Sequence, residues 1–286
     1  MSEQLATTAY FGIPGSFTYG AAMKYFGETS AYKGGATFKD VFSMVKSGEC
    51  QYGVIPIENT LAGSIYENYD LLDASQLFVT GEVSRRVEQS LLVSKFAGGV
   101  ALDELTAAYS HPKALDQCSV FFDAHPHIEK RSFADTASAA RFVSEQDDPT
   151  IAAIADNYVA EIYDLEVLQS NIEDNDQNFT RFLIVSNTEN PDTAEADKCA
   201  LIVHLDHVPG SLVKTLDYFY QANCSLTSIQ SRPMPEHPFE YIFYMDFIYN
   251  PRKQDMPRLL QGVEDQVAKL RVLGLFKREP TPFAVD

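Results

Sequence analysis

Short apolar runs alternate with amphipathic segments over the first 190 residues of the chain. The apolar runs predict strands at 9–12, 52–57, 77–82, 87–93, 151–155 and 180–185, and a further short strand that ends at 109–110. Apolar residues at helical spacing predict helices at 16–26, 38–46, 64–72, 112–122, 136–143 and 158–163. Strands that alternate with helices in this way are typical of an α/β layer fold.

The pattern changes after residues 187–198, a stretch rich in Thr, Glu, Asn, Pro, Asp and Ala that has no apolar periodicity. Such a stretch predicts a linker. Beyond it the order is β-α-β-β-α-β, with strands at 199–205, 226–231, 239–247 and 272–276 and helices at 210–222 and 256–270. This order predicts a small ferredoxin-like domain, a four-stranded antiparallel sheet with two helices on one face.

The charge of the chain also divides near the linker. The net charge of −18 comes from 22 basic and 40 acidic residues. Residues 1–197 hold 12 basic and 30 acidic residues, whereas residues 198–286 hold ten of each. The shift supports a domain boundary, and the missing basic stripe argues against nucleic-acid binding. We interpret the acidity mainly as a source of solubility.

Apolar runs, the first residues of the chain and the spacing of cysteine and histidine bear on where the protein resides and whether it binds a metal. No stretch approaches the roughly 18 to 20 apolar residues that a membrane helix needs, and residues 1–8 lack the features of a secretory signal. The four cysteines form no Cys-x-x-Cys pair, and the histidines form no metal-binding motif. We therefore expect a cytoplasmic protein that does not bind a membrane and has no metal site.

Five motifs place small, hydroxyl, amide or charged residues beside predicted strand ends and helix starts, at 12–18, 54–64, 110–118, 135–140 and 178–185. In open α/β sheets, ligands bind beyond the carboxyl ends of the strands, and N–H groups at helix starts hold anions. Helix capping, or a surface ion pair for the arginine in the last motif, is the plain alternative for each motif.

Taken together, the motifs resemble those of the monofunctional prephenate dehydratases of phenylalanine biosynthesis. The family's Gly-x-x-Gly-Ser-Phe, Pro-Ile-Glu-Asn-Ser/Thr, Ser-His-Pro…Gln-Cys and Thr-Arg-Phe stand here at 12–17, 56–60, 110–118 and 180–182. The C-terminal part resembles an ACT regulatory domain, with Pro-Gly-Ser-Leu at 209–212 and Gln-Ser-Arg-Pro at 230–233. The resemblance covers roughly residues 8–280 and leaves no room for the chorismate mutase helices of bifunctional relatives.

The resemblance implies an architecture. A catalytic domain over 1–190 would have two periplasmic-binding-protein-like lobes, with lobe 1 at about 1–82 plus 170–190 and lobe 2 at about 83–169. The chain would cross between the lobes near 80–86 and 165–175. The ACT domain would span 198–286. Because ACT modules pair across a two-fold axis, we expect a homodimer or a homotetramer.

The resemblance also implies the reaction, which converts prephenate to phenylpyruvate, water and CO2 without a redox or metal cofactor, because formation of an aromatic ring drives it. It implies catalytic roles for three residues. Thr180 would be a relay donor or a positioning group, and Asn59 would be an orienting donor. Glu58 would be a general acid if burial raises the pKa of its carboxyl, or otherwise a structural ion-pair partner.

Further residues would bind the substrate and an effector. The implied substrate-binding residues are Ser16, Thr60, Ser110, Gln117, Thr136, Arg181 and Phe182. The implied residues of an L-phenylalanine site for feedback inhibition are Pro209, Gly210, Ser211, Leu212, Gln230, Ser231, Arg232 and Pro233. Asp135 departs from the family by adding a negative charge near the expected anion site, and Lys113 could offset that charge.

Three alternatives stay open at this point. An arogenate dehydratase would carry out the same chemistry on an amino-acid substrate. A non-catalytic amino-acid-sensing binding protein would use the cleft without the reaction, although the Glu58-Asn59-Thr60 and Thr180-Arg181-Phe182 motifs favour an enzyme. A transport-linked solute-binding protein is disfavoured by the absence of a predicted signal peptide.

Overall fold

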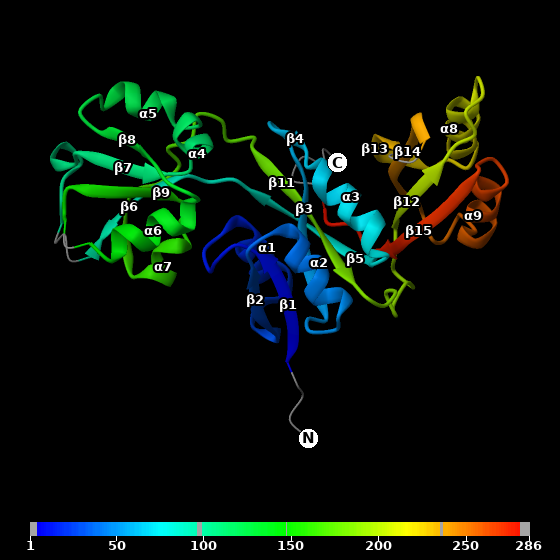
Figure 1. Ribbon diagram of the computed structural model, residues 1–286, viewed down its shortest axis with the longest axis horizontal. Helices are drawn as coiled ribbons and strands as arrows, with labels where there is room; N and C mark the ends of the chain where they lie inside the picture. The colour runs from blue at the N-terminus through cyan, green and yellow to red at the C-terminus, as the bar shows by residue number, and fades with distance from the viewer. Residues whose placement is uncertain (1–4, 96–98, 147, 235–236, 281–286) are drawn as a thin grey trace. The chain divides into compact units, whose positions relative to one another are not determined.

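The computed structural model describes residues 5–95, 99–146, 148–234 and 237–280 (Figure 1). Contacts divide the chain into two compact units. Unit 1 comprises residues 1–41, 54–65 and 84–182, and unit 2 comprises residues 42–53, 66–83 and 183–286. Three strands of the first sheet, β3, β5 and β11 (52–59, 78–86 and 179–186), contribute residues to both units.

The first sheet has the strand order β2-β1-β3-β11-β5, and the short β4 pairs with β3. Its strands are β1 (Ala6–Phe11), β2 (Ser30–Gly35), β3 (Tyr52–Asn59), β4 (Gly63–Ser64), β5 (Phe78–Arg86) and β11 (Phe179–Ser186). The helices of these chain regions are α1 (Phe17–Phe26), α2 (Phe38–Lys46) and α3 (Tyr66–Ser75). The run Val54–Ile57 is buried, as expected of an apolar strand in the interior of a sheet.

The second sheet lies within unit 1 and has the order β10-β6-β9-β7-β8. Its strands are β6 (Ser90–Ser94), β7 (Ala107–Ser110), β8 (Glu129–Ser132), β9 (Ile151–Ala155) and β10 (Leu165–Gln169). The helices around it are α4 (Pro112–Asp116), α5 (Ser119–Ala124), α6 (Thr136–Ser144) and α7 (Val159–Tyr163).

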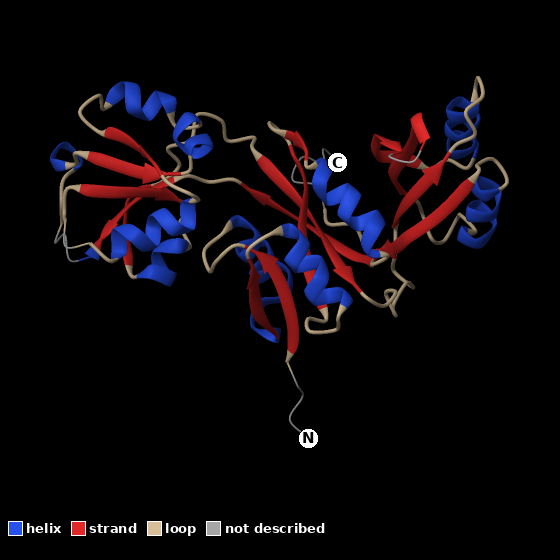
Figure 2. Cartoon of the chain, viewed as in Figure 1, coloured by secondary structure: helices blue, strands red, loops and turns tan. Residues whose placement is uncertain are grey.

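Alternating side chains of β9 supply two separate cores to this second sheet. Ile154 packs with residues of α4 and α5, whereas Ala153 packs with residues of α6 and α7. Figures 1 and 2 show these helix pairs on opposite sides of the strands. The sheet is therefore covered on both faces, and only its edges and strand ends are free to form a site.

The chain passes between the two sheets twice. It leaves the first sheet after β5 and enters the second at β6, through residues 87–89, and it returns between β10 and β11 through residues 170–178. The α/β fold with two lobes joined by two crossovers agrees with the predicted fold class.

The C-terminal part of unit 2 has the predicted order β-α-β-β-α-β. Its elements are β12 (Lys198–His204), α8 (Ser211–Gln221), β13 (Ser225–Met234), β14 (His237–Ile248), α9 (Met256–Glu264) and β15 (Lys269–Phe276). The sheet order is β13-β14-β12-β15, and every neighbouring pair is antiparallel. Phe219 of α8 and Val263 of α9 pack in one core against the sheet, so both helices cover the same face.

Several predicted elements differ from those observed. The predicted helix 112–122 is two short helices, α4 and α5, and the helix predicted over 256–270 ends at Glu264. The strands β2, β4, β8 and β10 had no counterpart in the predicted pattern. All four residues of β8 are exposed, which explains why no apolar signal marked this strand.

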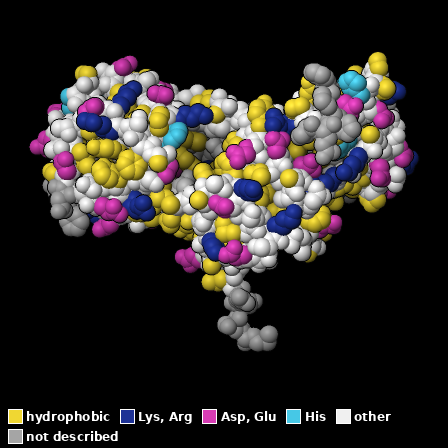
Figure 3. Space-filling model, viewed as in Figure 1, with side chains coloured by type: hydrophobic (Ala, Val, Ile, Leu, Met, Phe, Trp, Pro, Cys, Tyr) yellow, Lys and Arg dark blue, Asp and Glu magenta, His cyan; other side chains and the backbone are white. Residues whose placement is uncertain are grey.

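The surface drawn in Figure 3 intermixes basic and acidic side chains over the face in view. In the described part of the chain, no helix combines the length and the apolar character needed to cross a bilayer.

Candidate active site

A cavity of about 300 Å³ lies within unit 1, and residues from both lobes line it. Its lining residues are Phe17, Asn59, Ala62, Ile65, Val87, Gln89, His111, Lys113, Ala114, Gln117, Asp135, Thr136, Asn178 and Thr180. They come from the carboxyl end of β3 and the segment after it, the beginning of β11, the starts of α1, α4 and α6, the end of α4, and both crossovers. The cavity is large enough for a small organic molecule of about the size of a single substituted ring.

The amide of Asn59 is fixed at the carboxyl end of β3. Its Oδ1 accepts hydrogen bonds from the backbone N–H groups of Leu61, at 3.1 Å, and Ala62, at 2.8 Å. Its Nδ2 donates to Asn178 Oδ1 at 2.7 Å and to Thr180 Oγ1 at 3.0 Å. Because two backbone donors hold the oxygen, the nitrogen must face Thr180.

This contact sets the direction of the Thr180 hydroxyl. A hydroxyl has one O–H donor and two acceptor lone pairs, and Asn59 occupies one lone pair. Among the described residues, no group accepts the hydrogen of Thr180, and its side chain borders the cavity. The O–H of Thr180 is therefore available to donate to a bound molecule.

The charged lining residues are arranged so that the carboxylate is occupied and the ammonium is available. Asp135 caps α6: its Oδ1 accepts from Ser138 N at 2.7 Å and its Oδ2 from Ser138 Oγ at 2.6 Å. The structure records no ion-pair partner for the Lys113 ammonium in the part of the chain that it describes. The Lys113 ammonium offsets the negative charge of Asp135, and together with the N–H groups at the start of α6 it can bind an anionic ligand.

Comparison with known proteins shows which family contains this cavity. The family profile described as prephenate dehydratase matches residues 8–190, which is more than half of the chain. The chain belongs to the prephenate dehydratase family. All the residues that line the cavity fall within the part that matches this family.

Individual relatives agree over almost the whole chain. A bifunctional chorismate mutase/prephenate dehydratase of Pseudomonas aeruginosa is 34% identical over 277 residues, covering 96% of this chain and 74% of that protein. The structure of a prephenate dehydratase from Arthrobacter aurescens in complex with L-Phe has a TM-score of 0.82 at 28% identity, covering 96% of this chain and 90% of that chain. The structure of GqqA, described as a novel type of quorum quenching acylase, has a TM-score of 0.85 at 27% identity, covering 96% of this chain and 98% of that chain.

Of the residues predicted from the prephenate dehydratase motifs, four border this cavity: Asn59, Gln117, Thr136 and Thr180. Residues outside the predicted set complete the wall. Lys113 and Asp135 had been noted only as departures from the family. Asn178 opened the motif at 178–185 but had been given no role, and Gln89 belonged to no motif. Their positions in the crossovers and beside Thr180 could have been inferred only from the three-dimensional path of the chain.

Three predicted substrate-binding residues are occupied elsewhere. Ser16 caps α1, since its Oγ accepts from Tyr19 N at 3.2 Å and donates to Phe11 O at 2.9 Å. The buried Ser110 donates to Ile154 O at 2.6 Å. Thr60 joins its loop to the segment before β11, because its Oγ1 donates to Gln177 O at 2.9 Å. These hydroxyls make structural contacts and do not line the cavity, so the capping alternative describes Ser16 best.

Arg181 and Phe182 do not line the cavity. Arg181 points away from Thr180 because side chains alternate along β11, whereas Phe182 lies two positions further along the strand, on the same face as Thr180. Phe182 is almost fully buried in the core. Arg181 lies next to Thr180 along the strand and forms an ion pair with Glu58, at 3.9 Å between Nη1 and Oε2. The Glu58 side chain is 40% exposed, so it lacks the burial on which a general-acid role depended. The structural ion pair, which was the alternative, describes Glu58 better.

A second cavity, of about 390 Å³, lies in unit 2 at the start of α8. Pro209, Ser211 and Leu212 of the predicted effector motif line it, together with residues of β14 such as Glu240 and Tyr241. Gly210, beside them, has a φ of +89°, a left-handed conformation that favours glycine.

The other predicted effector motif, at 230–233, belongs to β13 and does not line this second cavity. Its arginine is held by helix α3. Arg232 Nε donates to Asp70 Oδ1 at 3.0 Å and Nη2 to Asp70 Oδ2 at 2.7 Å, while its guanidinium lies over the ring of Tyr66. This bidentate geometry fixes the arginine side chain on α3.

Among the described residues, no three His, Cys, Asp or Glu side chains come together as a group that could hold a metal ion.

Proposed function

We propose that this chain converts prephenate to phenylpyruvate, water and CO2 in the biosynthesis of phenylalanine. The proposal rests on one observation above all: in a member of the prephenate dehydratase family, the O–H of Thr180, held by Asn59, borders a cavity and is available to a bound molecule. A carbon–oxygen lyase needs such a donor at the oxygen that departs.

The reaction balances with one added proton. The bond between the ring and its carboxylate breaks, and its electron pair becomes part of the aromatic ring while CO2 leaves. The carbon–oxygen bond at the opposite ring carbon breaks with its pair on oxygen, and the departing hydroxyl takes up a proton to become water. Thr180 donates a hydrogen bond to that oxygen as negative charge develops on it, with Asn59 positioning the hydroxyl.

Binding of the two carboxylates would use Lys113 and the donors at the helix starts that line the cavity. Lys113 supplies a positive charge, and the start of α6 at Thr136 supplies backbone N–H groups and a favourable helix dipole. Gln117 adds an amide on the same wall. These donors can hold a dianion in a protein whose overall charge is strongly negative.

The test is an absorbance assay for phenylpyruvate with the purified full chain and prephenate. Formation of phenylpyruvate with saturation behaviour is expected, and its absence over a range of protein concentrations would refute the proposal. Competition between arogenate and prephenate distinguishes the two dehydratases. An arogenate dehydratase would convert arogenate directly to phenylalanine, and it would do so more efficiently than it converts prephenate.

We also propose that residues 198–286 form an ACT regulatory domain following a catalytic domain over 1–190, and that L-phenylalanine binds to it and inhibits. The support is the β-α-β-β-α-β order, the cavity at Pro209–Leu212, and the complex of the Arthrobacter aurescens relative with L-Phe. Titration calorimetry with L-phenylalanine should give a heat of binding together with inhibition of turnover. A homodimer or homotetramer stays a prediction, and sedimentation analysis would test it.

A further inference from the structure

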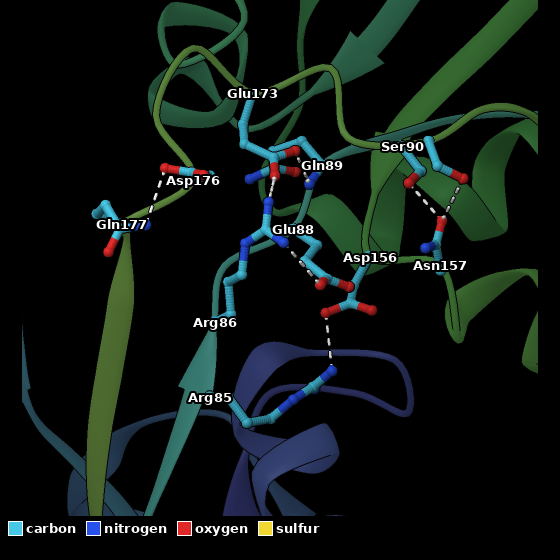
Figure 4. Close-up of polar contacts among 11 residues, drawn as sticks. Arg85, Arg86, Glu88, Gln89, Ser90, Asp156, Asn157, Glu173, Asp176 and Gln177 are labelled. Carbon is cyan, nitrogen blue, oxygen red and sulfur yellow. Dashed lines mark hydrogen bonds and ion pairs between the residues drawn. The ribbon is translucent and has the colours of Figure 1, made fainter. Parts of the chain in front are cut away.

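Gln89 lies in the first crossover and borders the same cavity as Thr180. Its backbone is tied on both sides to the second crossover: its N–H donates to Glu173 Oε2 at 2.9 Å, and its C=O accepts from Ile172 N at 2.9 Å. Glu173 is itself held by Arg86, at 2.5 Å between Nη2 and Oε1 (Figure 4). The Gln89 backbone is therefore fixed where the two crossovers meet.

The side chain of Gln89 is an exception among the amides of this wall. It is only 1% exposed, and its Oε1 has no hydrogen-bond partner in the described part of the chain. The neighbouring amides of Asn59 and Asn178 bond to each other. A buried acceptor without a partner lowers the stability of the folded protein, so such a group in a native protein calls for an explanation.

Among the residues that the structure describes, none donates a hydrogen bond to this oxygen. The amide nitrogen of Asn59, on the same wall, already donates to Asn178, Thr180 and the carbonyl of Phe179. A ligand is the remaining source. The prephenate dianion carries two carboxylates and a ketone, which only accept hydrogen bonds, and a single donor, the ring hydroxyl that departs in the reaction.

We propose that Gln89 accepts a hydrogen bond from the ring hydroxyl of the substrate and so orients the leaving group toward Thr180. The inference rests on the proposed dehydratase function. With its hydrogen directed to Gln89 Oε1, the hydroxyl presents its lone pairs to the free O–H of Thr180. Gln89 neither gains nor loses a proton. It fixes the rotation of the C–O–H group, and water leaves when the carbon–oxygen bond has broken.

A pair of substitutions separates this role from a structural one. Gln89→Met keeps the length of the side chain and removes both polar atoms, whereas Gln89→Glu keeps an acceptor oxygen. The matched control is Gln177→Met, the same change at an exposed amide on the second crossover, outside the cavity. Turnover of prephenate and the melting temperature are measured for the parent and all three variants.

For Gln89→Met we expect kcat/KM to fall by about tenfold or more, mainly through kcat, as one oriented hydrogen bond is lost. We expect its melting temperature to equal or exceed that of the parent, since a buried acceptor without a partner has been removed. Gln89→Glu should retain more turnover than Gln89→Met, with a higher KM because its charge opposes a dianion. Gln177→Met should behave like the parent.

Turnover of Gln89→Met within twofold of the parent would overturn the inference. So would a lower melting temperature, or a failure to fold, because either result would mean that the amide stabilises the protein. Failure of the dehydratase function itself is a different result: the parent would then form no phenylpyruvate, and the substitutions would have nothing to change.

Discussion

The two cavities differ in how completely their predicted motifs converge. In unit 1, the ends of β3 and β11 bring Asn59 and Thr180 into direct contact on one wall. In unit 2, the motif at 209–212 lines a cavity, but the motif at 230–233 lies elsewhere, with Arg232 held by Asp70. Hydrogen-bond donors with fixed directions line the first cavity. The second cavity lies between the start of α8 and the strand β14.

The contrast shows how hydrogen bonds within the protein determine which side chains stay available to bind a ligand. Asn59 has every hydrogen-bonding atom engaged by the protein, and this leaves the neighbouring Thr180 hydroxyl as the group that is free to act. Arg232 has its guanidinium engaged by a carboxylate, so it transmits a change in α3 more readily than it contacts a ligand in the cavity. Substitutions at each site should therefore affect different quantities.

Apart from loss of the Thr180 hydroxyl itself, the largest effect is expected for Asn59→Ala in unit 1. Loss of the amide leaves Thr180 without its positioning donor and releases the loop at Leu61 and Ala62. We expect kcat to fall by roughly 100-fold or more with a modest change in KM, since the contact acts on the transition state. Steady-state kinetics on a variant shown to be folded would check this, and a change confined to KM would assign Asn59 to substrate binding alone.

Lys113→Gln should act on binding more than on turnover. The lysine supplies the unpaired positive charge of the cavity, so KM for a dianionic substrate should rise by about tenfold while kcat changes less. Lys130→Gln is a matched control, because Lys130 lies over the ring of Phe122 outside the cavity and the net charge changes equally. Equal KM values for the two variants would mean that the overall charge, and not this cavity, governs binding.

A pH effect on stability should arise in unit 1 away from both cavities. Burial raises the pKa of Asp156 from its ordinary value of 3.8 to about 6, while Arg85, at 2.8 Å, opposes the shift (Figure 4). The folded protein then binds more protons than the unfolded chain between about pH 4 and pH 6. Stability from this group is therefore present at low pH and is lost as the pH rises through 6.

Urea unfolding at pH 5 and pH 7 measures this contribution, which should amount to about 1 kcal/mol. The difference between the two pH values should be smaller in Asp156→Asn, whose side chain does not titrate. An identical difference in parent and variant would show that other groups cause the pH dependence.

The smallest effect is expected in unit 2. Asp70→Asn weakens the pair with Arg232, which is partly exposed and worth up to about 1 kcal/mol. We expect the L-phenylalanine concentration for half inhibition to shift by about threefold to fivefold, with turnover in the absence of effector unchanged. An unaltered response to L-phenylalanine would mean that the contact between β13 and α3 plays no part in regulation.

The sequence predicted the elements that bury a regular apolar face. The run at Val54–Ile57 and the stripe on α8 carried a clear period, and each is observed as a strand or a helix. The exposed β8 carried no such period. The break between α4 and α5 depends on Asp174, which accepts hydrogen bonds from Ser119 N and Val120 N, each at 2.9 Å. A partner so distant in the chain cannot be recognised from the local pattern.

The candidate site, like the fold, was only partly predictable from the sequence. The polar residues at the ends of β3 and β11 were predicted to act together, and Asn59 and Thr180 are in contact. Within the same motifs, however, pattern alone could not assign which side chains face the cavity. Ser110 turns into the core and Arg181 pairs with Glu58. Gln89 has no motif of its own, because its importance comes from where the two crossovers meet.

The direct test of the account compares Thr180→Val with Thr180→Ser in the prephenate assay. Valine preserves the shape of the side chain but removes the O–H, whereas serine keeps it. We predict that kcat falls by roughly 100-fold to 10,000-fold for valine and remains within about tenfold of the parent for serine, with both variants folded. A valine variant that turns over prephenate at nearly the parent rate would contradict the claim that the Thr180 hydroxyl assists the departing oxygen.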